Sequence, residues 1–280
     1  MMKVLSPTDE LTAAQFGWIS DRVRELCGIN LHQGKAPLVR ARLVKRLRTL
    51  GLSSYGQYLR RIKNDPDGTE VMAMLDALST NLTYFFREPR HFEILRSRVL
   101  PALLKRHDRD RRLRLWSAGC SSGEEPYSIA ITLHEAVDDL ASWNAGILAT
   151  DLSSPMLHLA RRGLYPPHRL RAASPRVVRE CFLRFGDRAQ PVYRVRNFVR
   201  RSVDFARLNL MDRWPMKGPL DVIFCRNVMI YFDKAAQAQL VERFWNLLAP
   251  GGTLFVGHSE SLAGLQDRFR YVQPTVYEKP

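Results

Sequence analysis

The sequence lacks the long apolar run that a membrane-spanning helix requires. No stretch approaches the roughly 18 consecutive apolar residues of such a helix. The opening residues, MMKVLSPTDELTAAQF, also lack the apolar centre of a secretory signal peptide. Among the 280 residues, 45% are hydrophobic and 25% are charged, which is typical of globular rather than disordered chains. We therefore expect a cytoplasmic protein with no membrane insertion, containing one large domain and one small one.

Cysteine is scarce, and its spacing excludes the common metal and redox motifs. The four cysteines, Cys27, Cys120, Cys181 and Cys225, lie far apart and form no CxxC pair. Zinc sites and redox centres usually need such pairs. We expect free thiols and no bound metal.

Acidic residues are few relative to basic ones, which leaves a net charge of +15. Between Cys27 and Asn64 there are nine Lys or Arg residues and no Asp or Glu, and twelve Arg fall between Arg161 and Arg201. Such basic surfaces indicate an acidic partner. Composition alone leaves nucleic acid, an anionic membrane surface and an acidic protein as candidates.

Residues 1–80 contain apolar periodicities of helices and no strand pattern. Helices are predicted over 11–27, 36–50, 55–63 and 70–79, with Gly28 and Gly51 ending the first two. The 36–50 helix is amphipathic, and its outer face carries four basic residues that could bind a partner. These are Arg42, Lys45, Arg46 and Arg48. We predict a small all-helical N-terminal domain over 1–80.

Residues 81–280 alternate strands and helices, which indicates an α/β domain with a parallel sheet. Strands are predicted over 113–117, 146–150, 203–206, 220–225, 253–256 and 271–277, and helices over 89–106, 126–137, 155–162 and 235–248. The alternation breaks between about 165 and 202. There a helix over 175–185 and an antiparallel strand or hairpin in PVYRVRNFVRRSV are predicted, so we interpret this segment as an inserted antiparallel β-subdomain.

A glycine-rich turn follows the first of these strands, at Ser117 to Gly123. Ligands of open parallel sheets bind at such turns, but the full GxGxxG spacing of dinucleotide sites is absent. Glu124 and Glu125 come next, at the start of a helix. Carboxylates there repel a pyrophosphate and suit an ammonium or sulfonium group. The turn therefore favours S-adenosylmethionine over NAD, although first-turn acids also occur simply because the helix dipole favours them.

Polar residues also follow the other parallel strands. Asp151 ends the second strand, in the position from which a carboxylate accepts ribose hydroxyls. Asn209-Leu210 and Cys225-Arg226-Asn227 follow later strands, so all should lie at one sheet edge. Tyr231, in NVMIYF, could reach the reacting centre. No proline occupies this segment, whereas adenine methyltransferases have two there, which weakens a nucleic-acid interpretation.

The segment TNLTYFFREP joins the two predicted domains. Asn81, Thr83 and Arg87 are polar residues among apolar ones, as expected where aromatic side chains are buried and polar groups face a ligand. A hinge packed by its aromatics explains the same pattern.

Four separated motifs, TNLTYFFREP, WSAGCSSGEEPYSIAITL, FCRNVMIYFD and LFVGHSE, resemble the chemotaxis-receptor glutamate O-methyltransferases (CheR family) in order and over nearly the whole chain. The resemblance implies a Rossmann-like S-adenosylmethionine-dependent methyltransferase domain over 81–280. It also implies methyl transfer to glutamates on the cytoplasmic helices of a chemoreceptor, with S-adenosylhomocysteine as product. The insertion corresponds to a small β-subdomain that binds a receptor tail peptide in some members. Alternatives are a methyltransferase acting on RNA or DNA, or a non-catalytic regulator that binds S-adenosylmethionine.

The resemblance also implies roles for individual residues. Arg87 and Tyr231 would flank the transferred methyl group as catalytic residues. Nine residues would touch the cofactor: Asn81, Thr83, Arg87, Glu125, Asp151, Asn209, Leu210, Cys225 and Arg226.

Overall fold

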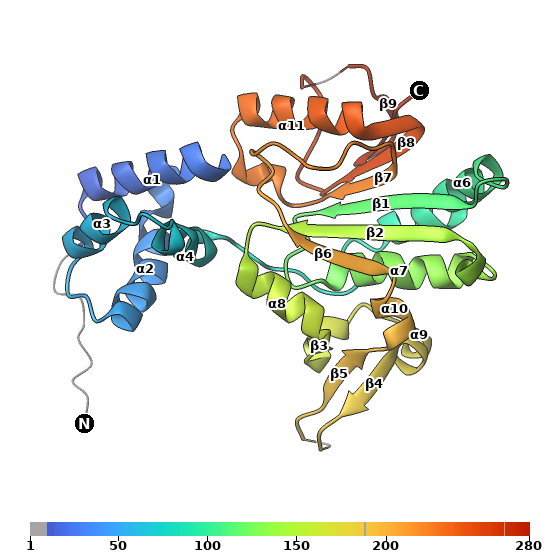
Figure 1. Cartoon of the computed structure of the whole chain (residues 1–280), viewed down its shortest axis with the longest axis horizontal. Coiled ribbons are helices and arrows are strands. Elements are labelled where there is room, and N and C mark those ends of the chain that lie inside the picture. Colours follow the sequence, from blue (N-terminus) through green and yellow to red (C-terminus); the bar gives the residue numbers. More distant parts are fainter. Residues whose placement is uncertain (1–9, 188, 266) are drawn as a thin grey trace. The chain divides into compact units, whose positions relative to one another are not determined.

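The computed structural model describes residues 10–187, 189–265 and 267–280 (Figure 1). The chain forms two compact units. The first comprises the N-terminal residues up to Thr80 together with Tyr231–Asp233, and the second comprises Asn81–Ile230 and Lys234–Pro280. No helix in the described ranges is long and apolar enough to cross a membrane.

The described part of the first unit is helical, as predicted. Its helices are α1 (Ala13–Cys27), the short η1 (Gln33–Lys35), α2 (Ala36–Leu50), α3 (Tyr55–Lys63) and α4 (Thr69–Leu78). Thr12 caps α1 by accepting the Gln15 N–H at 3.2 Å, and left-handed glycines end α1 and α2. The apolar stripe of α2, at Val39, Leu43 and Leu47, is almost fully buried, which fixes the basic stripe on the other side.

The second unit contains a seven-stranded sheet in the order β6-β2-β1-β7-β8-β10-β9. The strands are β1 (Arg112–Ala118), β2 (Asn144–Asp151), β6 (Val203–Arg207), β7 (Leu220–Cys225), β8 (Leu248–Val256), β9 (Arg270–Gln273) and β10 (Val276–Glu278). The strands from β6 to β8 in this order are parallel, whereas β10 and β9 add antiparallel edges. The chain runs outward from β1 to β6 and returns at β7, so the strand order reverses between β1 and β7. Ligands bind outside the carboxyl ends of strands at such a reversal.

Helices cover both faces of this sheet. One long helix is divided into α5 (Arg90–Ile94), a π-helical stretch η2 (Leu95–Val99) and α6 (Leu100–Arg106), and it packs against α7 (Glu124–Ala136). With α8 (Ser154–Arg162), α7 lies on one side of the sheet, while α11 (Lys234–Leu247) lies on β8 on the other (Figure 1). The same part of the chain contains the short helical turns η3 (Leu140–Ser142) and η4 (Pro167–Leu170), and a further turn, η5 (Met229–Tyr231), leads from the second unit into the first. The predicted α/β class, with a Rossmann-like sheet, is confirmed.

The insertion between α8 and β6 forms a separate three-stranded antiparallel sheet, which confirms the predicted β-subdomain. Its strands are β3 (Leu164–Tyr165), β4 (Phe182–Phe185) and β5 (Val192–Val195), in the order β3-β5-β4.

Three sequence predictions about secondary structure are wrong in part. The helix expected over 175–185 stops as α9 (Pro175–Cys181), because the next residues pair as β4 with β5. The alternating pattern after Pro191 forms β5 but then the helical turn α10 (Asn197–Arg200). The single strand expected over 271–277 is a hairpin, since Thr275 adopts a left-handed φ of 67° between β9 and β10. Tertiary pairing decides each of these short segments.

Candidate active site

The glycine-rich turn after β1 brings two strand ends into close contact. Gly119 has a φ of 84°, and a Cβ at this position would lie 2.4 Å from Cγ2 of Val228, in the loop after β7. Gly123 has a φ of 95°, and its Cβ would lie 2.8 Å from that of Ala160 in α8. Any other residue would push the turn away from both neighbours. The glycines therefore set the backbone at the strand reversal.

Asp151 lies at the end of β2, beside this turn. Its Oδ2 accepts the Ser121 N–H at 2.7 Å and its Oδ1 accepts the Ser153 N–H at 2.8 Å. The residue is only 9% exposed. Backbone hydrogen bonds thus fix the carboxylate at the sheet edge that the sequence predicted.

The two acids at the start of α7 have different surroundings. Glu124 faces inward, where its carboxylate accepts the Ser122 hydroxyl at 2.7 Å and pairs with Arg169 at 3.2 Å. Glu125 instead accepts the Ser117 hydroxyl at 2.7 Å, beside the carboxyl end of β1. Burial raises the pKa of both carboxyl groups. The structure therefore separates two acids that the sequence treated alike, and Glu125 is the one at the strand ends.

Arg226, directly after β7, is buried between two carboxylates. Its side chain is 1% exposed, and its guanidinium pairs with Glu125 at 3.2 Å and with Glu88 at 3.1 Å. It also donates a hydrogen bond to the Arg87 carbonyl. Burial disfavours the ionised form of Glu88, but Arg226 and hydrogen bonds from Asn227 and His258 outweigh this effect and lower the Glu88 pKa. Arg226 therefore connects the 81–89 segment to the ends of β1 and β7.

The Glu260 carboxylate, which was not predicted from the sequence, holds the loop after β7. The side chain of Glu260 accepts backbone N–H groups of Asn227 at 2.8 Å, Val228 at 2.9 Å, Ile230 at 3.2 Å and Gly257 at 2.5 Å. Gly257 permits this approach, since a Cβ there would lie 2.8 Å from the Glu260 carboxylate. The only available signal was the LFVGHSE motif itself. Glu88, the residue after Arg87, was likewise not predicted as a site residue.

The TNLTYFFREP segment packs onto the second unit through its aromatics. Phe85 is fully buried and meets Tyr165 and Phe182 edge to face, at centroid distances of 4.9 and 5.0 Å. The Asn81 carbonyl accepts the Ser121 hydroxyl at 3.3 Å, and the Thr83 carbonyl accepts a hydrogen bond from Arg169.

Arg87 lies at the other end of this segment and is half-buried. Its guanidinium donates to the Leu82 carbonyl at 2.7 Å. The segment thus brings Asn81 and Arg87 to the glycine-rich turn and to Arg226, respectively.

The remaining cofactor candidates lie after β6 and at the end of β7. The Asn209 side chain accepts the Met211 N–H and donates to Asp212, both at 3.1 Å, so it shapes its own loop. Leu210 and Cys225 are buried. Burial raises the Cys225 pKa well above its ordinary value, which keeps the thiol neutral and unreactive. The same holds for Cys120.

Tyr231 belongs to the first unit rather than the second. Its carbonyl accepts the Asn30 N–H at 2.7 Å, and the Lys35 ammonium lies 5.3 Å from its ring centroid. The side chain is half-buried.

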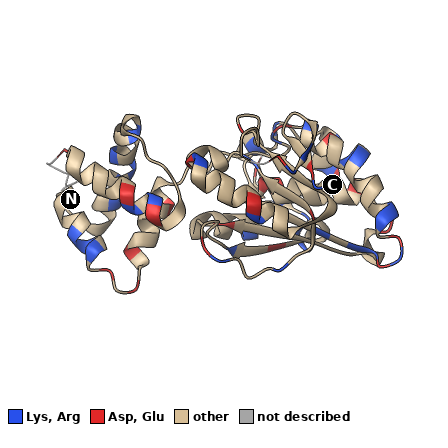
Figure 2. Ribbon diagram, turned by 90° about the horizontal axis from the view of Figure 1, so that it is seen from above, with Lys and Arg blue, Asp and Glu red and all other residues tan. Residues whose placement is uncertain are grey.

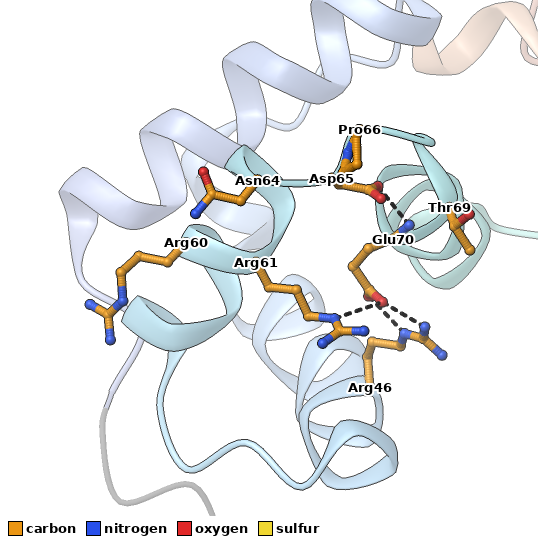
Figure 3. A pocket seen from close by; sticks show the side chains of 8 residues that line it. All are labelled: Arg46, Arg60, Arg61, Asn64, Asp65, Pro66, Thr69 and Glu70. Atoms are coloured by element: carbon orange, nitrogen blue, oxygen red, sulfur yellow. Dashed lines mark hydrogen bonds and ion pairs between the residues drawn. The ribbon is translucent and has the colours of Figure 1, made fainter.

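The four basic residues of α2 are not equivalent. Arg42 donates to the carbonyls of Leu78 and Ser79 at 2.5 and 3.0 Å, and Arg46 forms a bidentate pair with Glu70 at 2.8 and 2.7 Å. Arg46 and Glu70 line a pocket of about 640 Å³ with Arg60 and Arg61 (Figure 3). Lys45 and Arg48 are exposed. Two of the four therefore fasten α2 to its own unit.

The residues at the strand reversal fit a bound S-adenosylmethionine. The N-terminus of α7 carries acids instead of a free phosphate cradle, which suits a cationic ligand. Asp151 and Glu125 supply carboxylate oxygens at the ends of β2 and β1, where ribose hydroxyls and a charged amino group can be bound. Sheet order and site together define an S-adenosylmethionine-dependent methyltransferase.

Comparison with known proteins identifies the family. Residues 14–79 match the family described as "CheR methyltransferase, all-alpha domain", and residues 81–278 match "CheR methyltransferase, SAM binding domain". The "Chemotaxis protein methyltransferase 2" of Pseudomonas aeruginosa is 43% identical over 269 residues, covering 95% of this chain and 93% of the relative. The "Chemotaxis protein methyltransferase" of Escherichia coli is 40% identical over 269 residues, covering 95% and 91%. The chain belongs to the CheR methyltransferase family. It is a chemotaxis protein methyltransferase, a protein-glutamate O-methyltransferase that uses S-adenosylmethionine.

Proposed function

We propose that the cofactor lies over the carboxyl ends of β1, β2 and β7 and that the methyl group passes to glutamates on the cytoplasmic helices of a chemoreceptor. The observation that carries the proposal is the fixed Asp151 carboxylate beside the glycine-rich turn, with Glu125 of α7 bonded to Ser117 near the end of the neighbouring strand β1. The nine residues carried over from the family would contact the cofactor as a set: Asn81, Thr83, Arg87, Glu125, Asp151, Asn209, Leu210, Cys225 and Arg226. Cys225 and Leu210 would form part of the apolar wall of the cofactor site. Arg226 would act mainly by holding the Glu125 carboxylate in place.

The proposed mechanism depends on positioning, because the nucleophile needs no activation. A glutamate side chain, with an ordinary pKa near 4.3, is already ionised at neutral pH. S-adenosylmethionine, when bound, supplies a methyl group made electrophilic by the sulfonium. Aligning the carboxylate with that methyl group can contribute on the order of 7–11 kcal/mol, and excluding water removes hydration from the carboxylate. The chain therefore needs donors that orient a carboxylate rather than a general base.

Arg87 and Tyr231 are the proposed orienting donors. The Arg87 guanidinium now donates to the Leu82 carbonyl, a single neutral acceptor that an incoming carboxylate would outcompete through a charge-assisted bidentate bond. The phenol of Tyr231 would supply a second, neutral donor. We propose that both orient the ionised carboxylate of the substrate and that neither acts as a general base.

The test replaces Arg87 with alanine and compares it with Arg90→Ala, since the Arg90 side chain is 69% exposed and pairs with the exposed Glu93 at 2.9 Å. We expect Arg87→Ala to lower turnover at least ~100-fold, about 2.7 kcal/mol of barrier, with little change in stability. The readout is transfer of labelled methyl to purified receptor fragments. Turnover equal to that of Arg90→Ala would remove Arg87 from the mechanism.

Receptor recognition is proposed to depend on charge. The glutamate-rich target helices are acidic, and Lys and Arg residues occur in both units (Figure 2). Complementary charge accelerates the encounter of two partners and fixes their register. On α2 the exposed Lys45 and Arg48 are the stronger candidates for contact, since Arg42 and Arg46 have internal partners. We expect the enzyme to act in the cytoplasm and to leave RNA and DNA unmethylated.

A further inference from the structure

A cluster of three side chains in the second unit has no role in the proposed methyl transfer. Glu88 precedes α5, His91 lies in α5, and His258 follows β8. One ligand atom from each lies within 4.8 Å of the other two. The Glu88 Oε2 atom lies 3.4 Å from His91 Nδ1 and 3.8 Å from His258 Nε2.

Two of these three atoms are buried and make no hydrogen bond in the described structure, although one of them is ion-paired. His91 is 1% exposed and its Nδ1 has no hydrogen-bond partner, whereas the Glu88 Oε2 lies 3.1 Å from the Arg226 guanidinium. The other Glu88 oxygen is used, since Oε1 accepts from Asn227 Nδ2 at 3.3 Å and from the His258 N–H at 3.4 Å. Leaving a buried polar atom unpaired costs about 1–3 kcal/mol, so such atoms usually have a missing partner.

The surroundings of His91 indicate what that partner is. Its Nε2 lies 2.6 Å from Thr275 Oγ1, and that hydroxyl in turn lies 2.5 Å from the Pro274 carbonyl and donates to it. The Thr275 oxygen is then the acceptor, so Nε2 carries the ring proton and Nδ1 presents a lone pair. A lone pair facing a carboxylate oxygen at 3.4 Å is repulsive, and the distance is too long for a shared proton. A cation between the two atoms would satisfy both.

We propose that Glu88, His91 and His258 form a binding site for a divalent transition metal of the zinc class. Two imidazoles and one carboxylate suit Zn²⁺, Co²⁺ or Ni²⁺ rather than Mg²⁺ or Ca²⁺, which take oxygen ligands. Ligand atoms at about 2.1 Å from a tetrahedral Zn²⁺ are separated by roughly 3.4 Å. The separations of 3.4 and 3.8 Å from Glu88 Oε2 need little adjustment, and the two histidine nitrogens, which lie within 4.8 Å of each other, can approach by rotation of the exposed His258 side chain.

Two further features agree with this assignment. Metal-bound histidines usually donate their second ring N–H to a fixed partner, as His91 does to Thr275. The His258 side chain is 61% exposed, which provides an entry path and leaves a fourth coordination position to water. The positive charge of Arg226 disfavours metal binding, because its guanidinium lies 3.1 Å from the same Glu88 oxygen. Its charge is offset by Glu125, which pairs with it at 3.2 Å, so the site is expected to bind metal reversibly rather than permanently.

The test is a Co²⁺ titration of tag-free, EDTA-treated protein followed by visible absorption, with Zn²⁺ as competitor. We expect one Co²⁺ per chain, with bands typical of a tetrahedral site that Zn²⁺ abolishes. His258→Gln, at an exposed position that should leave folding intact, is expected to weaken Co²⁺ binding at least ~10-fold. His158→Gln, at an exposed histidine of α8, is the matched control and should bind like the wild type. Absence of stoichiometric binding, or equal affinity in His258→Gln and the wild type, would overturn the proposal.

Discussion

Replacing Glu260 with glutamine tests whether one buried carboxylate holds the loop that carries Arg226. The wild-type carboxylate accepts four backbone N–H groups, two on each oxygen. Glutamine keeps the shape but has a single acceptor oxygen. We expect that oxygen to retain the shorter pair, from Asn227 at 2.8 Å and Gly257 at 2.5 Å. The N–H groups of Val228 and Ile230 would then face an amide nitrogen that cannot accept.

The expected loss of stability follows from these two donors. An orphaned buried N–H costs about 1–3 kcal/mol, and both donors here are only partly buried, so the low end of the range applies to each. Burial raises the pKa of Glu260, which means that the ionised carboxylate itself is disfavoured and that its removal returns part of the cost. We therefore expect Glu260→Gln to lower the free energy of unfolding by about 1–2 kcal/mol, or the Tm by roughly 2–8 °C.

Urea denaturation and turnover on receptor fragments give the two readouts. Glu93→Gln in α5 is the matched control, since its side chain is 50% exposed and the change should stay within about 0.5 kcal/mol. Gly257→Ala should disturb the packing of Glu260 against the same loop without altering charge, because the new Cβ would lie 2.5 Å from the Asn227 side-chain nitrogen. Both Glu260→Gln and Gly257→Ala should reduce turnover more than Glu93→Gln. If Glu260→Gln is as stable and as active as Glu93→Gln, the carboxylate does not hold the loop.

Four further predictions concern the cofactor and the receptor. Asp151→Asn should weaken S-adenosylhomocysteine binding at least ~10-fold by calorimetry, because a charged acceptor contributes about 1.5–3 kcal/mol per hydrogen bond; unchanged affinity would place the ribose elsewhere. Glu125→Gln should weaken S-adenosylmethionine more than S-adenosylhomocysteine if the carboxylate faces the sulfonium, and both equally if it faces the amino group; no effect on either would contradict contact. Burial raises the Glu125 pKa, so the cofactor affinity of the wild type should fall as the pH drops through that raised value and the carboxylate is protonated. The folding stability contributed by this group has the opposite dependence: it is present at low pH and lost as the pH rises through the raised pKa. Glu125→Gln should abolish both pH dependences. Lys45→Glu with Arg48→Glu should slow receptor methylation at low salt, less so at high salt, with cofactor affinity intact; a salt-independent rate equal to the wild type would reject docking through α2.

Much of the architecture is determined by local pattern. The apolar period of 3.6 residues in 36–50 predicts α2 with both of its ends, and the mostly apolar run Leu220–Cys225 predicts β7 with the bounds observed. Glycines at 119 and 123 mark the turn after β1, because that turn requires a positive φ. Strand ends in a parallel sheet share one edge, so Asp151 and Arg226 could be assigned to that edge from sequence position alone.

Only the tertiary structure decides how side chains at that edge are paired. Glu124 and Glu125 are adjacent and chemically identical in the sequence, yet one is bound by Arg169 from the inserted segment and the other by Arg226, which follows β7. Glu260 meets a loop more than 25 residues earlier in the chain, and no local pattern records which distant N–H groups a carboxylate will accept. The sequence by itself determined the longer helices and the parallel strands, the sheet edge and the family, because these depend on local periodicity and on motifs. The partners of each buried charge were decided by the fold, because burial makes an unpaired charge costly and long-range packing selects what pairs with it.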